Sequence, residues 1–370
     1  MSYKATLIAF LLLISSALFG NDGSYYMSGN HLIPMIESGI DVRKEILTIK
    51  RVNEDYLQVN VYYEFFNPGE AKVLDVGFEA HSPSGDVDIR PLKGGHPYMS
   101  DFNVAMNGNN LQYAIAIVND SMYYKNGKFI KLTEQEVQNE IRGEMMADFF
   151  YAYHFKANFK KGLNTIAHSY RFKLSSSIDL EYDFNYILTT ANRWGNGKIE
   201  DFSLAIDMGE FQKFGIQQSF FKNANEWLIN GIGSTSKSKT TERVETQDSA
   251  TVFNIQNGAI IFNKLNFKPK GEIFLYSERH YLVYNDTFNA ANDLLPNEIF
   301  YWTPIVKDEF SMKVLRNLPY ARRGYVFNSA ELNAYFRKMD WYTPNPMYTA
   351  ELSSLTPLEQ KWLLVIKKVD

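Results

Sequence analysis

The chain contains no cysteine among its 370 residues. Disulfides, thiolate metal sites and a cysteine nucleophile are therefore excluded. A chain without cross-links must gain its stability by burying apolar surface, and a composition that is 45% hydrophobic and 15% aromatic supplies that surface. The length predicts two domains or more.

Recognisable catalytic and metal-binding motifs are also missing. The six histidines do not show the His-Glu-x-x-His spacing that brings two imidazoles to one metal on a helix. The sequence has no Gly-x-Ser-x-Gly nucleophile elbow and no Gly-x-x-x-x-Gly-Lys phosphate loop. His81, Asp86 and Asp88 follow a predicted strand and form either a weak hard-cation site or a solvated loop. We therefore predict no catalytic residue, no metal site and no cofactor.

Dense positive charge is absent too, and the formal net charge is −4. Without a basic stripe, nucleic acid is not expected as a partner. Residues 307–370 nevertheless carry ten basic and seven acidic side chains, a net of +3. This asymmetry suggests that the C-terminal part either docks on the more acidic remainder or meets an anionic surface such as a cell-envelope polymer.

Residues 1–20 have the pattern of a secretory signal peptide. Lys4 precedes an apolar run over residues 7–13, and small residues follow, with cleavage expected near Gly20 or after Ala17. The run is shorter than the ~20 residues that cross a bilayer, so an uncleaved anchor is the less favoured alternative. We expect an extracytoplasmic protein, periplasmic or secreted, with no transmembrane helix in the mature chain.

Residues 21–285 are predicted to form an antiparallel β-rich domain resembling a β-sandwich, or a pair of sandwiches. Apolar and polar residues alternate over many short segments, as in residues 56–65 and 74–80. Hairpin turns are predicted at Asn67-Pro68-Gly69, Asn107-Gly108, Asn126-Gly127 and Asn257-Gly258. One helix is expected after the capping box of Thr133 and Glu136. Residues 234–249 are expected to be an exposed loop or a wide hairpin tip.

A linker over residues 286–304 is predicted to lead into a small α-helical module over residues 305–370. Ser329 is an expected helix N-cap, and the residues after it place one apolar stripe on a helix. Thr356 and Glu359 form a second capping box. The stripe of the first helix comprises Leu332, Tyr335, Phe336 and Met339, and the apolar face of the second comprises Leu358, Trp362, Val365, Ile366 and Val369.

The C-terminal segment resembles the YARHG domain, a module of bacterial secreted proteins. The signature reads Tyr320, Ala321, Arg322, Arg323 and Gly324 and lies among aromatic positions at fixed spacing. Arg323 stands where the signature has histidine. Pro319 removes the backbone donor to the Leu315 carbonyl and is expected to kink or restart the helix. The resemblance implies a helical interaction module and no established activity. Residues 24–80 and 186–194 resemble, more loosely, an uncharacterised family of secreted bacterial proteins.

Candidate binding residues combine planar cationic and aromatic groups, which recur at binding hot spots and sugar platforms. They are Arg322, Arg323, Trp341, Tyr342, Pro344 and Tyr348. A structural role is the alternative for these residues, with Trp341 and Tyr342 covering the helices and Arg322 bonding the last carbonyls of its helix.

Two functions remain open from the sequence. The favoured hypothesis is a non-catalytic envelope protein whose YARHG-like module binds an envelope polymer or another extracytoplasmic protein. The alternative is a hydrolase acting on cell-wall glycan or peptide, with acidic side chains gathered from several strands.

Overall fold

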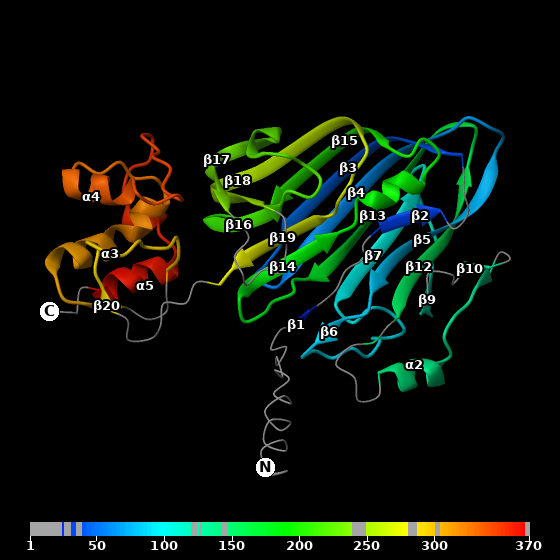
Figure 1. Ribbon diagram of the computed structural model, residues 1–370, viewed down its shortest axis with the longest axis horizontal. Coiled ribbons are helices and arrows are strands. Elements are labelled where there is room, and N and C mark those ends of the chain that lie inside the picture. Colours follow the sequence, from blue (N-terminus) through cyan, green and yellow to red (C-terminus); the bar gives the residue numbers. More distant parts are fainter. Residues whose placement is uncertain are drawn as a thin grey trace, which may run out of the picture.

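A computed structural model describes residues 24–25, 31–34, 39–119, 124–125, 128–141, 147, 149–238, 249–279, 287–299 and 304–366. The predicted signal peptide and the Asn126-Gly127 turn lie outside these residues. Figure 1 shows a β-rich body with a small helical module beside one end of it. The predicted fold class, an antiparallel β-sandwich-like part followed by a helical module, is confirmed.

The larger sheet has 11 strands. In spatial order they are β14 (Leu180–Tyr186), β19 (Ile273–Glu278), β16 (Gln212–Gln217), β18 (Ala250–Phe267), β15 (Ile199–Asp207), β3 (Asp41–Arg51), β4 (Tyr56–Asn67), β13 (Gly162–Lys173), β7 (Met99–Met106) and β8 (Asn109–Asn110), and β17 (Trp227–Ser238) also pairs with β18. Neighbouring described strands pair antiparallel except β15 and β3, which are parallel and join the two halves of the sheet.

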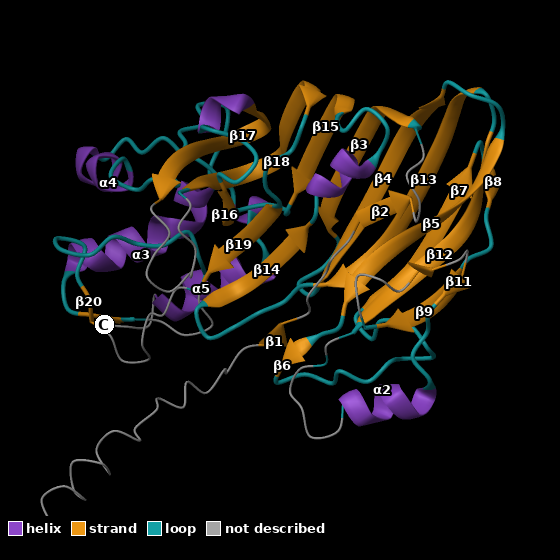
Figure 2. Ribbon diagram, turned by 45° about the vertical axis from the view of Figure 1, so that its right-hand side comes forward, coloured by secondary structure: helices purple, strands orange, loops and turns teal. Residues whose placement is uncertain are grey.

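A smaller sheet packs against part of the larger one. Its order is β2 (His31–Pro34), β5 (Lys72–His81), β12 (Phe150–Phe159) and β9 (Ala114–Val118). Figure 2 shows β5 and β12 in front of β4 and β13, as two layers of a sandwich. Three short pairs lie apart from both sheets: β1 (Ser24–Tyr25) with β6 (Ser84–Gly85), β10 (Tyr124–Lys125) with β11 (Lys128–Phe129), and β20 (Thr287–Phe288) with β21 (Ile305–Val306).

The described helices are few. The predicted capping box is confirmed at the start of α2 (Glu134–Glu140), where Thr133 and Glu136 bond reciprocally. Short 3-10 turns occur at η1 (Thr189–Arg193), η2 (Ala224–Glu226) and η3 (Leu352–Ser354). The C-terminal module contains α3 (Glu309–Arg322), α4 (Ala330–Phe336) and α5 (Pro357–Ile366).

The Asn67-Pro68-Gly69 turn does not close a hairpin, and that prediction is wrong. It leads from β4 in the larger sheet to β5 in the smaller one, while the Gly162 turn leads back from β12 to β13. Because β4 pairs with β13 and β5 with β12, the two connections are adjacent arches between layers. The buried Asn67 side chain ties them by donating to the carbonyl of Phe159 at 3.3 Å.

Asn257-Gly258 is not a turn either, because β18 runs unbroken through it. Gly258 (φ +96°) lies opposite Gly231 (φ +146°) in β17, and a Cβ on Gly258 would lie 2.1 Å from the Asn230 carbonyl oxygen. The glycines therefore serve a close approach of two strands. Asn107-Gly108 does form the predicted hairpin, between β7 and the short β8, but the next strand, β9, joins the other sheet.

The described parts of the 234–249 segment belong to a long hairpin. Strand β17 continues to Ser238, and Ser238 pairs with Ala250 at the start of β18. Residues 239–248 lie outside the described part. The prediction of a wide hairpin tip therefore agrees with the two strands on either side of it.

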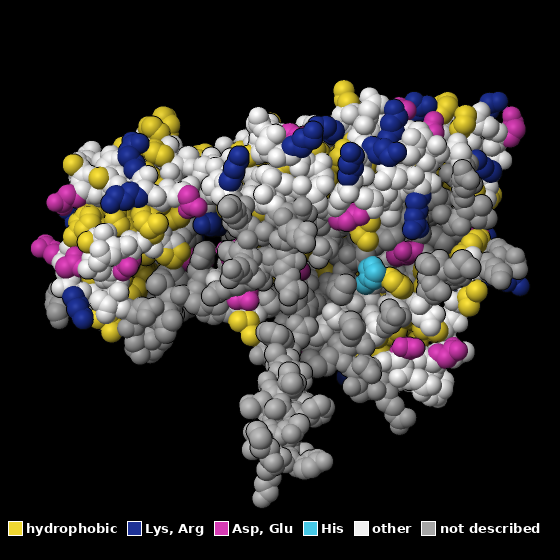
Figure 3. Space-filling model, viewed as in Figure 1, with side chains coloured by type: hydrophobic (Ala, Val, Ile, Leu, Met, Phe, Trp, Pro, Cys, Tyr) yellow, Lys and Arg dark blue, Asp and Glu magenta, His cyan; other side chains and the backbone are white. Residues whose placement is uncertain are grey.

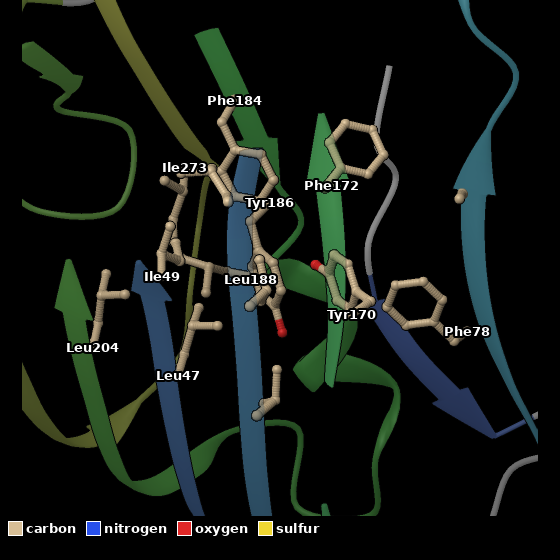
Figure 4. Close-up of a cluster of buried hydrophobic side chains, with 14 of the residues drawn as sticks. Leu47, Ile49, Phe78, Tyr170, Phe172, Phe184, Tyr186, Leu188, Leu204 and Ile273 are labelled. Atoms are coloured by element: carbon tan, nitrogen blue, oxygen red, sulfur yellow. The ribbon is translucent and has the colours of Figure 1, made fainter. Parts of the chain in front are cut away.

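Aromatic and branched side chains fill the space between the sheets. Figure 4 shows Tyr186 of β14 between Leu47 and Ile49 of β3 on one side and Tyr170 of β13 on the other. A separate cluster forms the core of the helical module, and it includes three residues of the predicted linker, Phe288, Ala290 and Leu295. Two cores fit two domains, whereas the boundaries at 20, 285 and 304 stay predictions.

Candidate functional site

The helical module follows the local signals of its sequence. Ser329 is the N-cap of α4, as predicted, and accepts a hydrogen bond from the Leu332 backbone N–H at 3.5 Å. The predicted stripe on this helix is buried in the core of the module. Asp308 caps α3 in the same way through the Ser311 N–H at 2.7 Å.

Pro319 does not interrupt α3, which is continuous from Glu309 to Arg322. A proline at 319 leaves the Leu315 carbonyl without its usual intrahelical donor. The indole N–H of Trp362, on α5, donates to that carbonyl at 2.9 Å. A tertiary hydrogen bond thus replaces the missing local one, and for this reason the expected restart of the helix is not observed.

Gly324 ends α3 and receives the loop that follows α4. Its φ of +76° favours glycine, and the Tyr325 N–H bonds to the Tyr320 carbonyl at 3.1 Å in a helix-ending turn. The Gly324 carbonyl accepts from the Asn345 N–H at 2.7 Å. A Cβ at 324 would lie 2.3 Å from the Thr343 carbonyl oxygen. Glycine is required here for its conformation and for the close approach of the loop.

Arg322 and Arg323, at the end of α3, both bind the carboxylate of Glu359 on α5. Arg322 Nη1 and Arg323 Nη1 lie 2.7 Å from Oε1, and Arg323 Nη2 lies 2.7 Å from Oε2. The Glu359 side chain is fully buried. Arg323, not Arg322 as predicted, also donates to a late carbonyl of α3, that of Pro319, at 2.9 Å. We call these three side chains the arginine lock.

Glu359 has a second task, because it also completes the predicted capping box of α5. The Thr356 N–H donates to Oε2 at 2.8 Å. Burial opposes ionisation of Glu359, but the bonds from Arg323 and the Thr356 N–H and the charges of both arginines outweigh it, so its pKa is lowered. Burial, with the like charge of Arg323, lowers the pKa of Arg322 to about 10, and Arg322 therefore stays protonated at neutral pH.

The arginine lock faces the β-rich part. The guanidinium carbons of Arg322 and Arg323 lie 4.6 Å and 4.7 Å from the ring centroid of Phe211, which precedes β16. Nearby, Lys213 Nζ lies 3.2 Å from a carboxylate oxygen of Asp340, and the Ser234 hydroxyl donates to the Asp340 carbonyl at 2.9 Å. The residues of the YARHG signature therefore hold the module together and also contact the β-rich part.

Trp341 and Tyr342 lie in the core of the module. The Trp341 indole donates to the Leu295 carbonyl at 2.8 Å, and the Tyr342 hydroxyl donates to the Tyr325 carbonyl at 2.7 Å. Pro344 is exposed, and Tyr348 is half-buried with its hydroxyl 2.7 Å from that of Ser354. The structure thus divides the six candidate residues into an arginine pair, two buried rings and two residues of a surface loop.

Sequence reasoning missed the partners of these residues. It assigned Glu359 only to a cap, and it placed Val365 on the buried face of α5, whereas Val365 is exposed and Glu359, Trp362 and Ile366 face inward. The burial of Glu359 could not be predicted from the local sequence, because a charged side chain is expected at the surface and only the two arginines on another helix make its burial favourable. Nothing local to Phe211 or Asp340 indicated an interdomain contact.

The weak cation-site candidates of the sequence were His81, Asp86 and Asp88, and the His81 ring lies against Phe150 with ring centroids 4.3 Å apart. Asp88 forms a salt bridge with Arg90 at 2.6 Å. Within the described ranges, no three His, Asp or Glu side chains are grouped so that they could hold a metal ion. No helix in that part of the chain is long and apolar enough to cross a membrane.

Comparison with known proteins identifies the module. Residues 306–370 match the family described as the YARHG domain. No curated protein matches the chain. Among solved structures, a Legionella pneumophila protein provisionally described as nutrient binding is 17% identical, with a TM-score of 0.47, over 95% of this chain and 100% of that one. An M1 zinc metallopeptidase of Deinococcus radiodurans is 10% identical, with a TM-score of 0.23, over 61% of this chain and 43% of that one.

Proposed function

We propose that this is a non-catalytic binding protein of the bacterial cell envelope, exported by its signal peptide, in which the YARHG domain binds another extracytoplasmic protein. The observation that carries this proposal is an exposed apolar loop on the module, defined by Pro344, Met347 and Leu352. Met347 is 90% exposed and Leu352 is 59% exposed. Figure 3 shows hydrophobic side chains at several points on the surface of this module.

Hydrogen bonds to the loop backbone hold the exposed loop in place. The Met347 N–H donates to the Asn345 side chain at 3.1 Å, and the Asn345 N–H donates to the Gly324 carbonyl at 2.7 Å. Because these bonds fix the backbone, a partner would bind without a large cost in ordering the loop. An exposed methionine also adapts its shape to apolar protein surfaces.

A protein partner fits these residues better than a polysaccharide does. Sugar recognition uses the exposed faces of aromatic rings. Of the three candidate rings, Trp341 and Tyr342 are buried and hydrogen-bonded within the module, and Tyr348 is half-buried. The loop offers Pro344, Met347 and Leu352 instead. An envelope polymer and the hydrolase alternative are therefore outcomes to be tested.

Site-specific crosslinking tests this function. A photoreactive residue at position 347 is introduced into the full-length chain in its own host, and the same residue at position 364 serves as the control. Leu364 is 63% exposed on α5 of the same module. We expect one extracytoplasmic protein to crosslink from position 347 and not from position 364. In a second experiment without the photoreactive residue, the purified protein should capture this partner, and the purified Met347→Asp variant should not.

Other results would contradict the proposal. Equal crosslinking from both positions would mean that the loop has no specific partner. Sedimentation of the purified protein with purified envelope polymer, unaffected by Met347→Asp, would replace the protein partner with a polymer. Release of products from cell-wall glycan or peptide would favour the hydrolase.

A further inference from the structure

A small pocket lies where the β-rich part meets the helical module. Its walls come from β16, β17, β18 and β19, and from Asp340 of the module, and Figure 1 shows these strands on the side of the body next to the module. The volume is about 140 Å³. The lining residues used below are Lys213, Lys237, Tyr276, Glu278 and Asp340. This pocket is distinct from the exposed loop of the proposed function.

Tyr276 provides a buried polar group to the pocket. Its ring lies directly against Gly215, where a Cβ would come within 2.6 Å of the ring, so the absence of a side chain at 215 makes room for it. Tyr276 is only 2% exposed, and its hydroxyl has no hydrogen-bond partner among the described residues. Burial and then the charge of Glu278 raise its pKa to about 12, so the hydroxyl stays neutral and can donate. A buried hydroxyl of this kind is stabilised by any ligand that accepts its hydrogen bond.

Charges of both signs line the same pocket. Lys213 and Lys237 contribute ammonium groups, and Glu278 and Asp340 contribute carboxylates. Lys213 and Asp340 come from different domains and pair at 3.2 Å. With this pair and the remaining Lys237 and Glu278, the lining carries equal positive and negative charge, and a ligand with both signs keeps this balance whereas a ligand with one sign does not. The lining therefore favours a zwitterion.

The volume limits the ligand to a small molecule. A cavity of about 150 Å³ takes up benzene. We propose that this pocket binds a zwitterion the size of a free amino acid. The ligand carboxylate lies toward the lysines and accepts from the Tyr276 hydroxyl, and the ligand ammonium lies toward Glu278 and Asp340. Because Asp340 belongs to the module, the bound zwitterion also strengthens the contact between the two domains.

Calorimetric titration of the full-length protein tests this proposal. The probes are a panel of free neutral amino acids, with acetate and methylammonium as single-charge analogues. We expect one or more of the amino acids to bind at millimolar concentration or below and neither analogue to bind. Tyr276→Phe keeps the ring and removes the hydroxyl, and we expect it to weaken binding about tenfold, as the loss of one hydrogen bond to a charged group does.

Tyr151→Phe is the matched control. Tyr151 is also fully buried with an unpartnered hydroxyl among the described residues, but it lies on β12 in the other sheet and not in the pocket. We expect the Tyr151→Phe variant to bind the amino acids with the same affinity as the unmodified chain. Lys237→Met, which changes an exposed side chain, should weaken binding without affecting folding.

Three results would overturn the proposal. They are the absence of binding across the amino-acid panel, equal binding of acetate or methylammonium, and unchanged affinity in both Tyr276→Phe and Lys237→Met. None of these results bears on crosslinking from position 347, so the pocket and the exposed loop can fail separately.

Discussion

Glu359 shows how much one residue can do when two elements meet at it. Its carboxylate closes the capping box of α5 and accepts hydrogen bonds from Arg322 and Arg323 on α3. A buried carboxylate is costly unless it is paired and hydrogen-bonded. In this chain Arg323 supplies a bidentate contact where the signature has histidine, and a shorter imidazole could not make two parallel bonds to one carboxylate.

Glu45 is the clearest source of pH-dependent stability. It is buried on β3 beside the hydroxyls of Tyr63 and Tyr186, and burial raises its pKa to about 8 although these hydroxyls oppose the shift. Between the ordinary value near 4.5 and 8, the folded state holds a proton that the unfolded state has lost. The free energy of unfolding therefore falls as pH rises through this range.

We expect Glu45→Gln to remove the part of this fall that comes from Glu45, while Asp183 and Glu298, whose pKa values burial also raises to about 7, keep their contributions. Near pH 4 the variant and the unmodified chain should have similar stability, and at pH 9 the variant should be more stable by on the order of a few kcal/mol. Urea unfolding from pH 4 to pH 9 measures the difference. Glu54→Gln, at an exposed position, is the control and should follow the unmodified chain. Parallel profiles for all three proteins would contradict the assignment to Glu45.

The bond from Trp362 to the Leu315 carbonyl predicts a coupling with Pro319. Trp362→Phe leaves that carbonyl buried without a donor and should cost about 1–3 kcal/mol, in addition to the lost packing. Pro319→Ala restores a backbone N–H at position 319 that can bond the same carbonyl. Trp362→Phe should therefore cost less in the Pro319→Ala background. A double-mutant cycle by urea unfolding measures this coupling, and additive effects within about 0.5 kcal/mol would contradict it.

At the scale of elements, turns decide where strands and helices go. The same kind of signal, a glycine between apolar runs, has three outcomes in this chain. It closes a hairpin at Gly108, forms an arch between sheets at Gly162, and allows two strands to approach closely at Gly258. A glycine in the sequence indicates either a change of chain direction or a position without room for a side chain. The surrounding strands determine which of the two occurs.

Gly324, at the end of α3, allows a test of how much a glycine contributes where the chain turns and a loop approaches closely. Gly324→Ala places a Cβ in the left-handed region, which costs about 1–2 kcal/mol, and also pushes it against the loop at Thr343. Gly209 also has a positive φ, but nothing lies within 4 Å of a Cβ at that position. We expect Gly324→Ala to lower the free energy of unfolding clearly more than Gly209→Ala does. Equal losses in chemical denaturation would show that the loop moves away without cost.

At the scale of the whole molecule, two separate cores are joined by a small set of contacts. The β-rich part and the helical module each have their own cluster of buried hydrophobic side chains. The contacts between the two parts centre on Phe211, Lys213 and Asp340. The ion pairs of the arginine lock all lie within the module, and Phe211 contacts the guanidinium groups of Arg322 and Arg323 from the β-rich part. We therefore expect that docking can be weakened without unfolding either part.

Phe211→Ala tests this separation. We expect the module to keep its helices but to populate a wider range of distances from the β-rich part. Because the chain has no cysteine, Leu228→Cys and Lys338→Cys provide the only two sites for spin labels. The distance distribution between them should broaden in Phe211→Ala. Phe66→Ala is the control, since Arg43 covers the Phe66 ring at 4.8 Å within the β-rich part, and it should leave the distribution narrow. An unchanged distribution in Phe211→Ala would show that the cation–π contacts do not hold the module.

The sequence by itself determined the features that depend on neighbours along the chain. Alternating residues made strands over residues 56–65 and 74–80, Thr133 and Ser329 capped helices, and the YARHG signature ended in a left-handed glycine. These features follow from backbone geometry and from side chains within one turn of each other, so a linear pattern is sufficient to specify them.

Only the tertiary structure decided what these elements pair with. It sent β4 and β5 into different sheets, placed β15 parallel to β3, and turned Glu359 toward two arginines instead of toward water. It also brought Tyr276 and Asp340 to one pocket. Each of these outcomes depends on contacts between residues far apart in sequence. The energy of burying a charge, or of pairing one strand with another, is set by those distant partners and not by neighbours along the chain.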